Sequence, residues 1–71
     1  MNKQPTLNDV VALLADFPAK RLARGQVGTV VDLPDANTAM VEFSDDEGRA
    51  FAISPVKSAS LLVLHYVPEA A

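Results

Sequence analysis

The order of apolar and polar residues in the second part of the chain predicts a series of short β-strands. Several runs are rich in β-branched residues or alternate between apolar and polar side chains, which is typical of half-buried strands. The expected strands are Val27–Leu33, Thr38–Phe43, Arg49–Ser54 and Ser60–Val67. Turn signals separate them: a turn at Pro34–Asn37, an acidic hairpin loop at Ser44–Gly48 and a single 3-10 turn at Pro55–Ala59.

Alternation also predicts which side chains of these strands face the core, because successive residues of a strand point to opposite faces. The expected inward side chains are Val30, Leu33, Ala39, Val41, Phe43, Phe51 and Ile53. Met40 and Glu42 then fall on the outer face. Gly25 and Gly28 allow a tight loop that leads directly into the Val27 strand.

The first segment of the chain fits two structures. Leu7, Val10, Val11, Leu14 and Phe17 have the spacing of one helical face, and Thr6 with Asp9 resembles a capping box. The run Asp9–Leu14 is also an acceptable buried strand that ends before Pro18. Periodicity alone favours the helix.

Four stretches resemble the bacterial domain-of-unknown-function family 4926: Asp9–Leu14, Arg24–Val31, Val41–Phe43 and Leu61–Tyr66. The resemblance covers roughly residues 7 to 66. It implies a five-stranded SH3-like small barrel, mostly β, with a 3-10 turn before the last strand and no established activity. It also implies that the first segment is a strand at about Val10–Ala15, preceded by at most a short turn at Thr6–Asp9. We therefore expect one domain over residues 1–71, with its core at about 9–67.

Composition limits the classes of function. With 71 residues and no cysteine, the chain predicts one small domain without disulfides or thiolate metal sites. No apolar run reaches the roughly 18 residues of a membrane span, and Met1–Thr6 lacks a signal-peptide core, so we expect a cytoplasmic protein without a membrane partner. The net charge of −3 does not give the basic footprint that nucleic-acid-binding domains usually carry.

Candidate chemistry is sparse. His65 is the only histidine, so neither a histidine metal site nor a catalytic triad has enough members, and we expect no catalytic residue, metal or cofactor. The acidic residues 45–47 lack the ligand spacing of an EF-hand and are expected to form a solvated hairpin tip. No small-molecule ligand is indicated.

The last strand motivates the first functional hypothesis. Leu61–Leu64 is apolar at every position, so both faces of that strand need cover, which the N-terminal segment, the long first loop or another chain would supply. Met40 and Val31 are further apolar residues that alternation sends outward. The hypothesis is a non-enzymatic interaction module that docks a protein partner or its own copy. The proposed contact residues are Met40, Leu62, Leu64, His65 and Tyr66.

Two alternatives remain at this point. The paired glycines are similar to the KOW element of ribosomal and transcription-factor small barrels, and Lys20, Arg21 and Arg24 could then contact RNA, although no aromatic residue is interleaved with them. The corner Ile53–Val56 is similar to that of the type II dihydrofolate reductases, which work as tetramers with a central pore. The run Phe51–Ser54 lacks the glutamine and tyrosine of their reactive strand, which argues against that activity.

Overall fold

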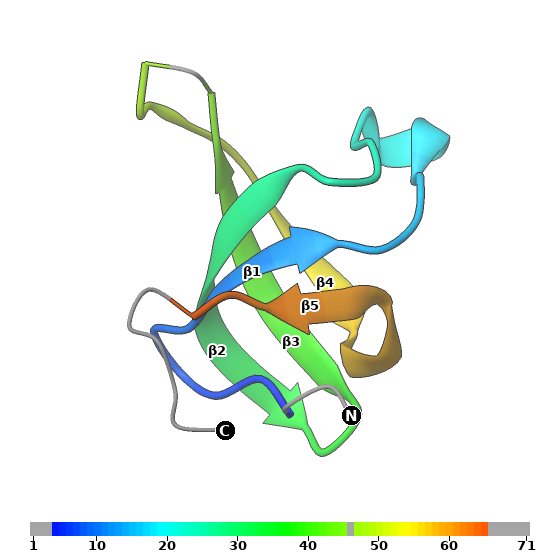
Figure 1. The fold of residues 1–71 in the computed structure, drawn as a ribbon, viewed down its shortest axis with the longest axis vertical. Helices are drawn as coiled ribbons and strands as arrows, with labels where there is room; N and C mark the ends of the chain where they lie inside the picture. The colour runs from blue at the N-terminus through cyan, green and yellow to red at the C-terminus, as the bar shows by residue number, and fades with distance from the viewer. Residues whose placement is uncertain (1–3, 46, 66–71) are drawn as a thin grey trace.

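The computed structural model describes residues 4–45 and 47–65, apart from the side chain of Phe51. These residues form β1 (Val10–Leu13), β2 (Val27–Asp35), β3 (Thr38–Ser44), β4 (Ala50–Lys57) and β5 (Leu61–Val63), with two 3-10 helices, η1 (Pro18–Lys20) and η2 (Ser58–Ser60) (Figure 1). The predicted mostly-β class and the 3-10 turn before the last strand are confirmed.

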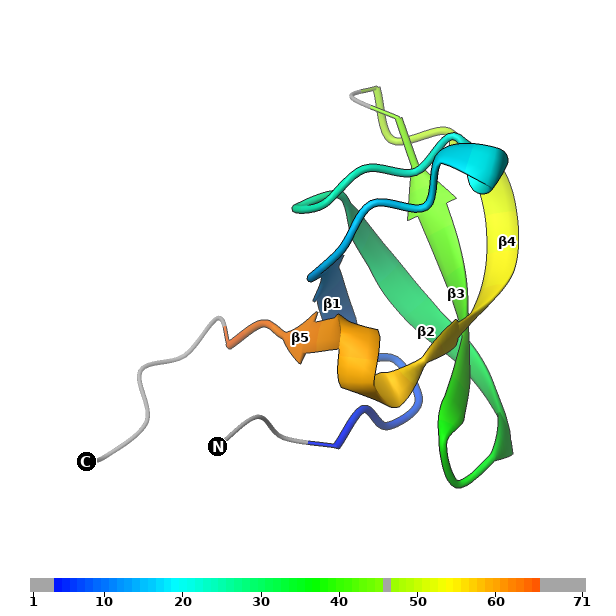
Figure 2. The same cartoon turned by 90° about the vertical axis from the view of Figure 1, so that its right-hand side faces the viewer.

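The strands form one antiparallel sheet in the order β4-β3-β2-β1-β5. β4 and β5 are therefore its two edges, and η2 carries the chain from one edge to the other as the sheet curls (Figures 1 and 2). Within the described residues no pairing joins β4 to β5, so the sheet is open in its hydrogen bonding.

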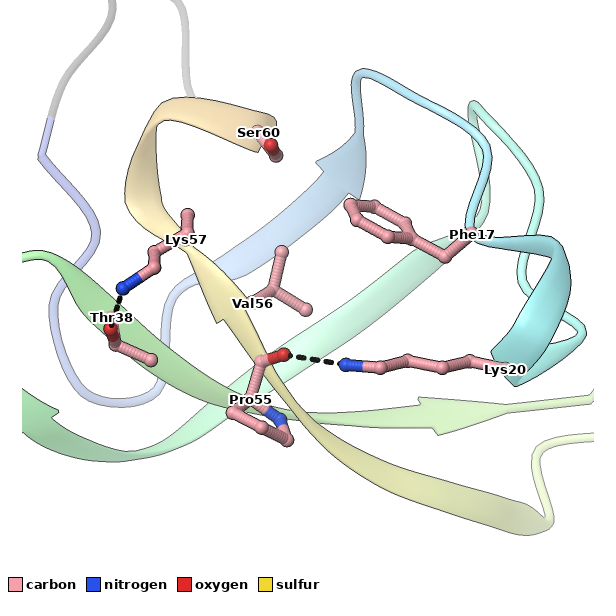
Figure 3. A pocket seen from close by; sticks show the side chains of 7 residues that line it. All are labelled: Phe17, Lys20, Thr38, Pro55, Val56, Lys57 and Ser60. Atoms are coloured by element: carbon pink, nitrogen blue, oxygen red, sulfur yellow. Dashed lines mark hydrogen bonds between the residues drawn. The ribbon is translucent and has the colours of Figure 1, made fainter.

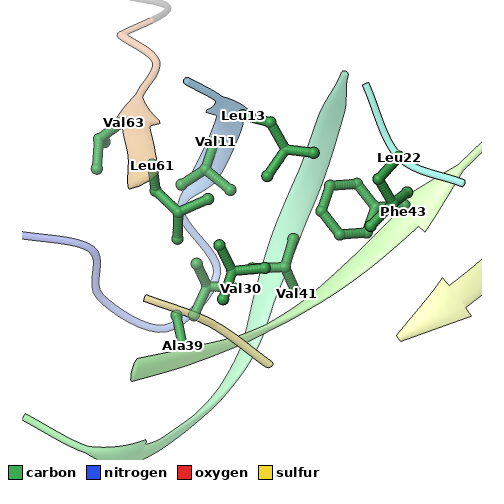
Figure 4. Packing of buried hydrophobic residues seen from close by; sticks show 10 residues of the cluster. Val11, Leu13, Leu22, Val30, Ala39, Val41, Phe43, Leu61 and Val63 are labelled. Atoms are coloured by element: carbon green, nitrogen blue, oxygen red, sulfur yellow. The ribbon is translucent and has the colours of Figure 1, made fainter. Parts of the chain in front are cut away.

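A single apolar cluster fills the concave side of the curled sheet (Figure 4). Its buried members are Val11, Leu13, Leu22, Val30, Ala39, Val41, Phe43, Val56, Leu61 and Val63. Alternation predicted four of them correctly: Val30 and the Ala39, Val41 and Phe43 series of β3. Phe43 is the largest fully buried side chain of the cluster.

Two side chains that were predicted to face the core lie outside it. Leu33 is 38% exposed and Ile53 is 58% exposed. In β2, register shifts between Val30 and Asp35 place extra residues in the strand, which changes the face that Leu33 presents. In β4, the pairing of Ser54 with the inward Val41 sends Ile53 to the outer face.

The prolines end fewer strands than expected. Pro34 lies inside β2 beside a register shift, so the hairpin turn is formed by residues 36 and 37 alone. Pro55 lies within β4, and the 3-10 turn begins later, at Ser58. Proline is tolerated at both places because a residue at a bulge or on an edge strand does not need its backbone N–H for a hydrogen bond to the neighbouring strand. The last strand was predicted to reach Val67, but β5 ends at Val63. Residues 66 and 67 of the predicted strand lie outside the described part of the chain.

The first segment is a strand, as the family resemblance implied, but it is shorter than Val10–Ala15. Val11 pairs with Gly28 of β2 on one side and with Val63 of β5 on the other. Pairing on both sides overrides the local helical periodicity. Before the strand, the Asp9 carboxylate accepts hydrogen bonds of 2.9 Å from the Thr6 backbone N–H and hydroxyl, which forms a turn.

The β2–β3 turn gives a prediction about acid stability. The backbone N–H of Asn37 donates to Asp35 Oδ1 at 2.8 Å, and this bond is the main cause that holds the pKa of Asp35 below its ordinary value of 3.8. A lowered pKa in the folded state stabilises the fold above the ordinary value, and this contribution is lost as the pH falls through the folded value. A carboxyl-carbon NMR titration should give an Asp35 midpoint below 3.8, and a midpoint at or above that value contradicts the turn geometry.

Candidate functional site

The long β1–β2 loop folds back on itself and is anchored in the core. Phe17 and Leu22 form an isolated antiparallel bridge that encloses η1, and Leu22 is buried. Gly25, with a φ of +87°, donates its N–H to the Leu13 carbonyl at 2.7 Å. The half-buried Phe17 packs against the core cluster, so the loop has a fixed position over β4.

A pocket of about 400 Å³ lies where this loop faces β4 and η2 (Figure 3). Its lining residues are Phe17, Lys20, Thr38, Pro55, Val56, Lys57 and Ser60. Figure 3 shows the Lys20 side chain reaching from η1 toward β4, whereas the Lys57 side chain extends toward Thr38 of β3. The pocket therefore combines apolar walls with two cations and two hydroxyl groups.

Both pocket ammonium groups are bonded to neutral oxygens. Lys20 Nζ donates to the Pro55 carbonyl at 3.0 Å and lies 6.0 Å from the centre of the Phe17 ring. Lys57 Nζ donates to Thr38 Oγ1 at 3.5 Å. Within the described residues, the ion pairs shorter than 4.0 Å are those of Arg49, so no carboxylate pairs directly with either lysine. Lys57 also interacts electrostatically with Asp35 and helps to lower the pKa of that carboxyl group.

A second surface lies on the convex face of β5, β1 and β2. Ala12 pairs with Leu62 on one side and with Val27 on the other, so these three side chains form a row across the sheet. Leu64 donates its N–H to the Val10 carbonyl at 2.8 Å and extends the row along both strands. We call this set the outer apolar strip: Val10, Ala12, Val27, Leu62 and Leu64. Val27 is 45% exposed and Leu62 is 41% exposed.

The structure divides the predicted docking residues. Leu62 and Leu64 lie in the outer apolar strip, and the exposed His65 follows directly. Met40 is half-buried on β3, which β2 and β1 separate from β5. Tyr66 lies outside the described residues. The strip also contains Val27, which lies opposite Ala12. This pairing depends on strand register and could not be predicted from the sequence.

The three basic residues of the β1–β2 loop have different surroundings. Lys20 enters the pocket, while Arg21 is exposed and adopts a left-handed backbone with a φ of +57°. The backbone N–H of Arg24 donates to Asp16 Oδ1 at 2.8 Å, which places an acidic group beside this residue. Sequence reasoning missed Phe17 and Lys57 as partners of Lys20, because the pocket forms only when the loop folds onto β4.

Residues 4–45 and 47–65 contain neither a cluster of metal ligands nor a helix long enough to cross a membrane. No group of three or more His, Cys, Asp or Glu side chains is arranged there to hold a metal ion. The helices in this part of the chain are 3-10 helices of three residues each, far shorter than a helix that crosses a membrane.

Comparison with known proteins gives one match. The model of a family described as Domain of unknown function (DUF4926) matches residues 7–63, which is most of the chain. No curated protein and no solved structure matches the chain.

Proposed function

The chain belongs to the DUF4926 family, whose description assigns no activity, and we propose that this member is a non-enzymatic interaction module. The module docks a second copy of the chain through the outer apolar strip. We treat the curled sheet as an SH3-like small barrel, in which η2 bridges the gap between β4 and β5. The observation that carries the proposal is the row of Leu62, Ala12 and Val27 on three adjacent strands.

Contiguity distinguishes this strip from ordinary exposed apolar residues. Single exposed leucines and valines are normal on protein surfaces, but adjoining ones that form a patch mark interaction sites. The small Ala12 side chain lies between two larger ones, Val27 and Leu62, so the row has relief into which an apolar side chain fits. Burial of a whole leucine or valine side chain contributes roughly 1.5–3 kcal/mol, so covering the strip with a second chain is favourable.

The other segments that could cover the strip lie elsewhere in the described part of the chain. In the N-terminal segment, Gln4 Nε2 donates to the Ala36 carbonyl and the Asn8 N–H donates to the Val30 carbonyl, both at 2.9 Å. This segment therefore lies along β2 and its hairpin turn. The β1–β2 loop packs over β4 at the pocket. Of the three covers expected for the last strand, another chain is the one that remains.

A second copy fits the chemistry of the strip. None of its five side chains is charged, so two strips related by a twofold axis bring apolar groups together without opposing like charges. β5 is also an edge strand, which leaves the strip accessible from the side of Leu62. An isologous dimer therefore covers both strips at once.

Leu62→Asp should weaken self-association. The aspartate places a charge in the middle of the apolar interface, and we expect the dimer dissociation constant to rise by about tenfold or more, which corresponds to about 1.4 kcal/mol. Light scattering coupled to size-exclusion chromatography should give the wild type a mass approaching twice 7.6 kDa as concentration rises, and the variant a mass closer to that of one chain at the same concentrations.

Ile53→Asp is the matched control, because Ile53 is more exposed than Leu62 but lies on β4, outside the strip. We expect it to dimerise like the wild type, with circular dichroism showing that both variants are folded. A wild type that stays monomeric at millimolar concentration would rule out the second copy as the occupant. Equal loss of dimer in both variants would show that the strip is not the interface.

A further inference from the structure

The pocket between the β1–β2 loop and β4 is distinct from the outer apolar strip and has a chemistry of its own. It brings a basic residue of the loop, Lys20, and a basic residue of the edge strand, Lys57, to the same hollow. We propose that this pocket binds the carboxylate side chain of an acidic peptide segment from another protein. The site goes beyond the proposed dimer, because it requires only one copy of the chain.

The charges of the pocket favour an anion. The Lys20 and Lys57 ammonium groups donate to a backbone carbonyl and to a threonine hydroxyl. Hydrogen bonds from an ammonium group to a carboxylate are roughly twice as strong as bonds between neutral groups. An incoming carboxylate therefore offers each lysine a better acceptor than the one it has. Ser60 adds a hydroxyl group to the same lining.

The acidic residue Asp35 acts on Lys57 from outside the pocket lining. Asp35, the last residue of β2, interacts electrostatically with Lys57, and its carboxylate accepts hydrogen bonds from the Asn37 N–H at 2.8 Å and from the N–H and hydroxyl of Thr38. It is not part of the pocket lining, and no ion pair shorter than 4.0 Å joins it to Lys57 within the described residues. Lys20 has the Phe17 ring and the Pro55 carbonyl as its contacts.

The apolar lining favours a peptide over a free inorganic anion. Phe17, Pro55 and Val56 supply hydrocarbon surface beside the two cations (Figure 3). A volume of about 400 Å³ lies within the range of about 300–1,000 Å³ that is typical of ligand pockets, and it exceeds the needs of a lone carboxylate. The remaining space suits the aliphatic part of a glutamate and an apolar neighbour.

The same lining disfavours RNA. The Lys20 ammonium group lies over the Phe17 ring, 6.0 Å from its centre, so a stacked base would compete with this contact. The chain carries a net charge of −3, which opposes the long-range attraction of a polyphosphate. A single carboxylate depends mainly on the one ammonium group that it contacts instead.

NMR titration of the ¹⁵N-labelled full chain tests this site with a pair of blocked peptides, acetyl-Val-Glu-Val-amide and acetyl-Val-Gln-Val-amide. The glutamate peptide should shift the amide resonances of Phe17, Lys20, Val56 and Lys57. It should bind about fivefold more tightly than the glutamine peptide, which is the largest gain in affinity expected from one exposed ion pair. Equal binding of the two peptides, or no binding of either, would overturn the proposal.

Lys20→Gln and Lys57→Gln should each weaken binding of the glutamate peptide by about two- to fivefold. Arg49→Gln removes the same charge from the β3–β4 hairpin, outside the pocket, and should leave binding unchanged. Inorganic phosphate and an oligouridine are the competing probes. If either shifts these resonances and the glutamate peptide does not, the pocket is a phosphate or RNA site and the proposal fails.

Discussion

Phe43→Ala is expected to lower the free energy of unfolding by about 3–5 kcal/mol. The Phe43 side chain is 0% exposed, and it is the largest fully buried side chain among the described residues (Figure 4). Its removal leaves a cavity in the core cluster, which rigid strand pairing prevents from collapsing completely. Small domains commonly have only about 5 kcal/mol of stability or slightly more, so the variant should retain only about 0–2 kcal/mol at 25 °C.

Urea unfolding followed by circular dichroism measures this loss, and Ile53→Ala serves as its control. Ile53 is 58% exposed on the outer face of β4, so we expect a loss of less than about 1 kcal/mol. If Phe43→Ala were no more destabilising than Ile53→Ala, the assignment of Phe43 to the core would be wrong. The pair therefore checks which faces of β3 and β4 point inward.

Gly28→Ala should be the second most damaging change, with a loss of about 1–3 kcal/mol or more from overpacking. A Cβ atom at this position would lie 2.6 Å from Val41 Cγ1, 2.8 Å from the Glu42 carbonyl oxygen and 2.9 Å from Phe43 Cδ1. The carbonyl oxygen cannot retreat easily, because Glu42 lies in a strand that pairs on both sides. Close packing of backbone against backbone therefore requires glycine here.

Gly25→Ala provides the comparison for that variant. Gly25 has a φ of +87°, which costs an alanine about 1–2 kcal/mol, but nothing lies within 4 Å of the added Cβ. Chemical denaturation should thus rank Gly28→Ala as the less stable of the two. A Gly28 variant as stable as the wild type would contradict the close approach of β2 and β3.

The alternation of β3 made its inward face predictable, because its pairing with β2 and β4 keeps Ala39, Val41 and Phe43 on one side of the sheet. The same rule failed for Ile53. The phase of β4 depends on its register with β3, and the register shift near Ser44 is not visible in the residue pattern. Local patterns give strands, whereas register comes from contacts between segments that are distant in the sequence.

The candidate sites, too, were predictable only where they depend on local sequence patterns. The apolar run of the last strand pointed to Leu62 and Leu64, and both lie in the outer apolar strip. Val27 joins them only because Ala12 pairs with both neighbours. The pocket was not predictable, since Phe17 and Lys57 are far apart in the sequence and meet through the folded β1–β2 loop. Lys20 drew attention as part of a basic cluster, but its ammonium turns toward Pro55.

The most direct test of the docking surface is the concentration dependence of methyl resonances in the wild-type chain. If two copies meet through the outer apolar strip, dilution from millimolar to micromolar concentration should shift the methyl signals of Val27 and Leu62 while those of Ile53 stay constant. Methyl signals of Val27 and Leu62 that do not move, or shifts confined to Ile53 on β4, would contradict the account.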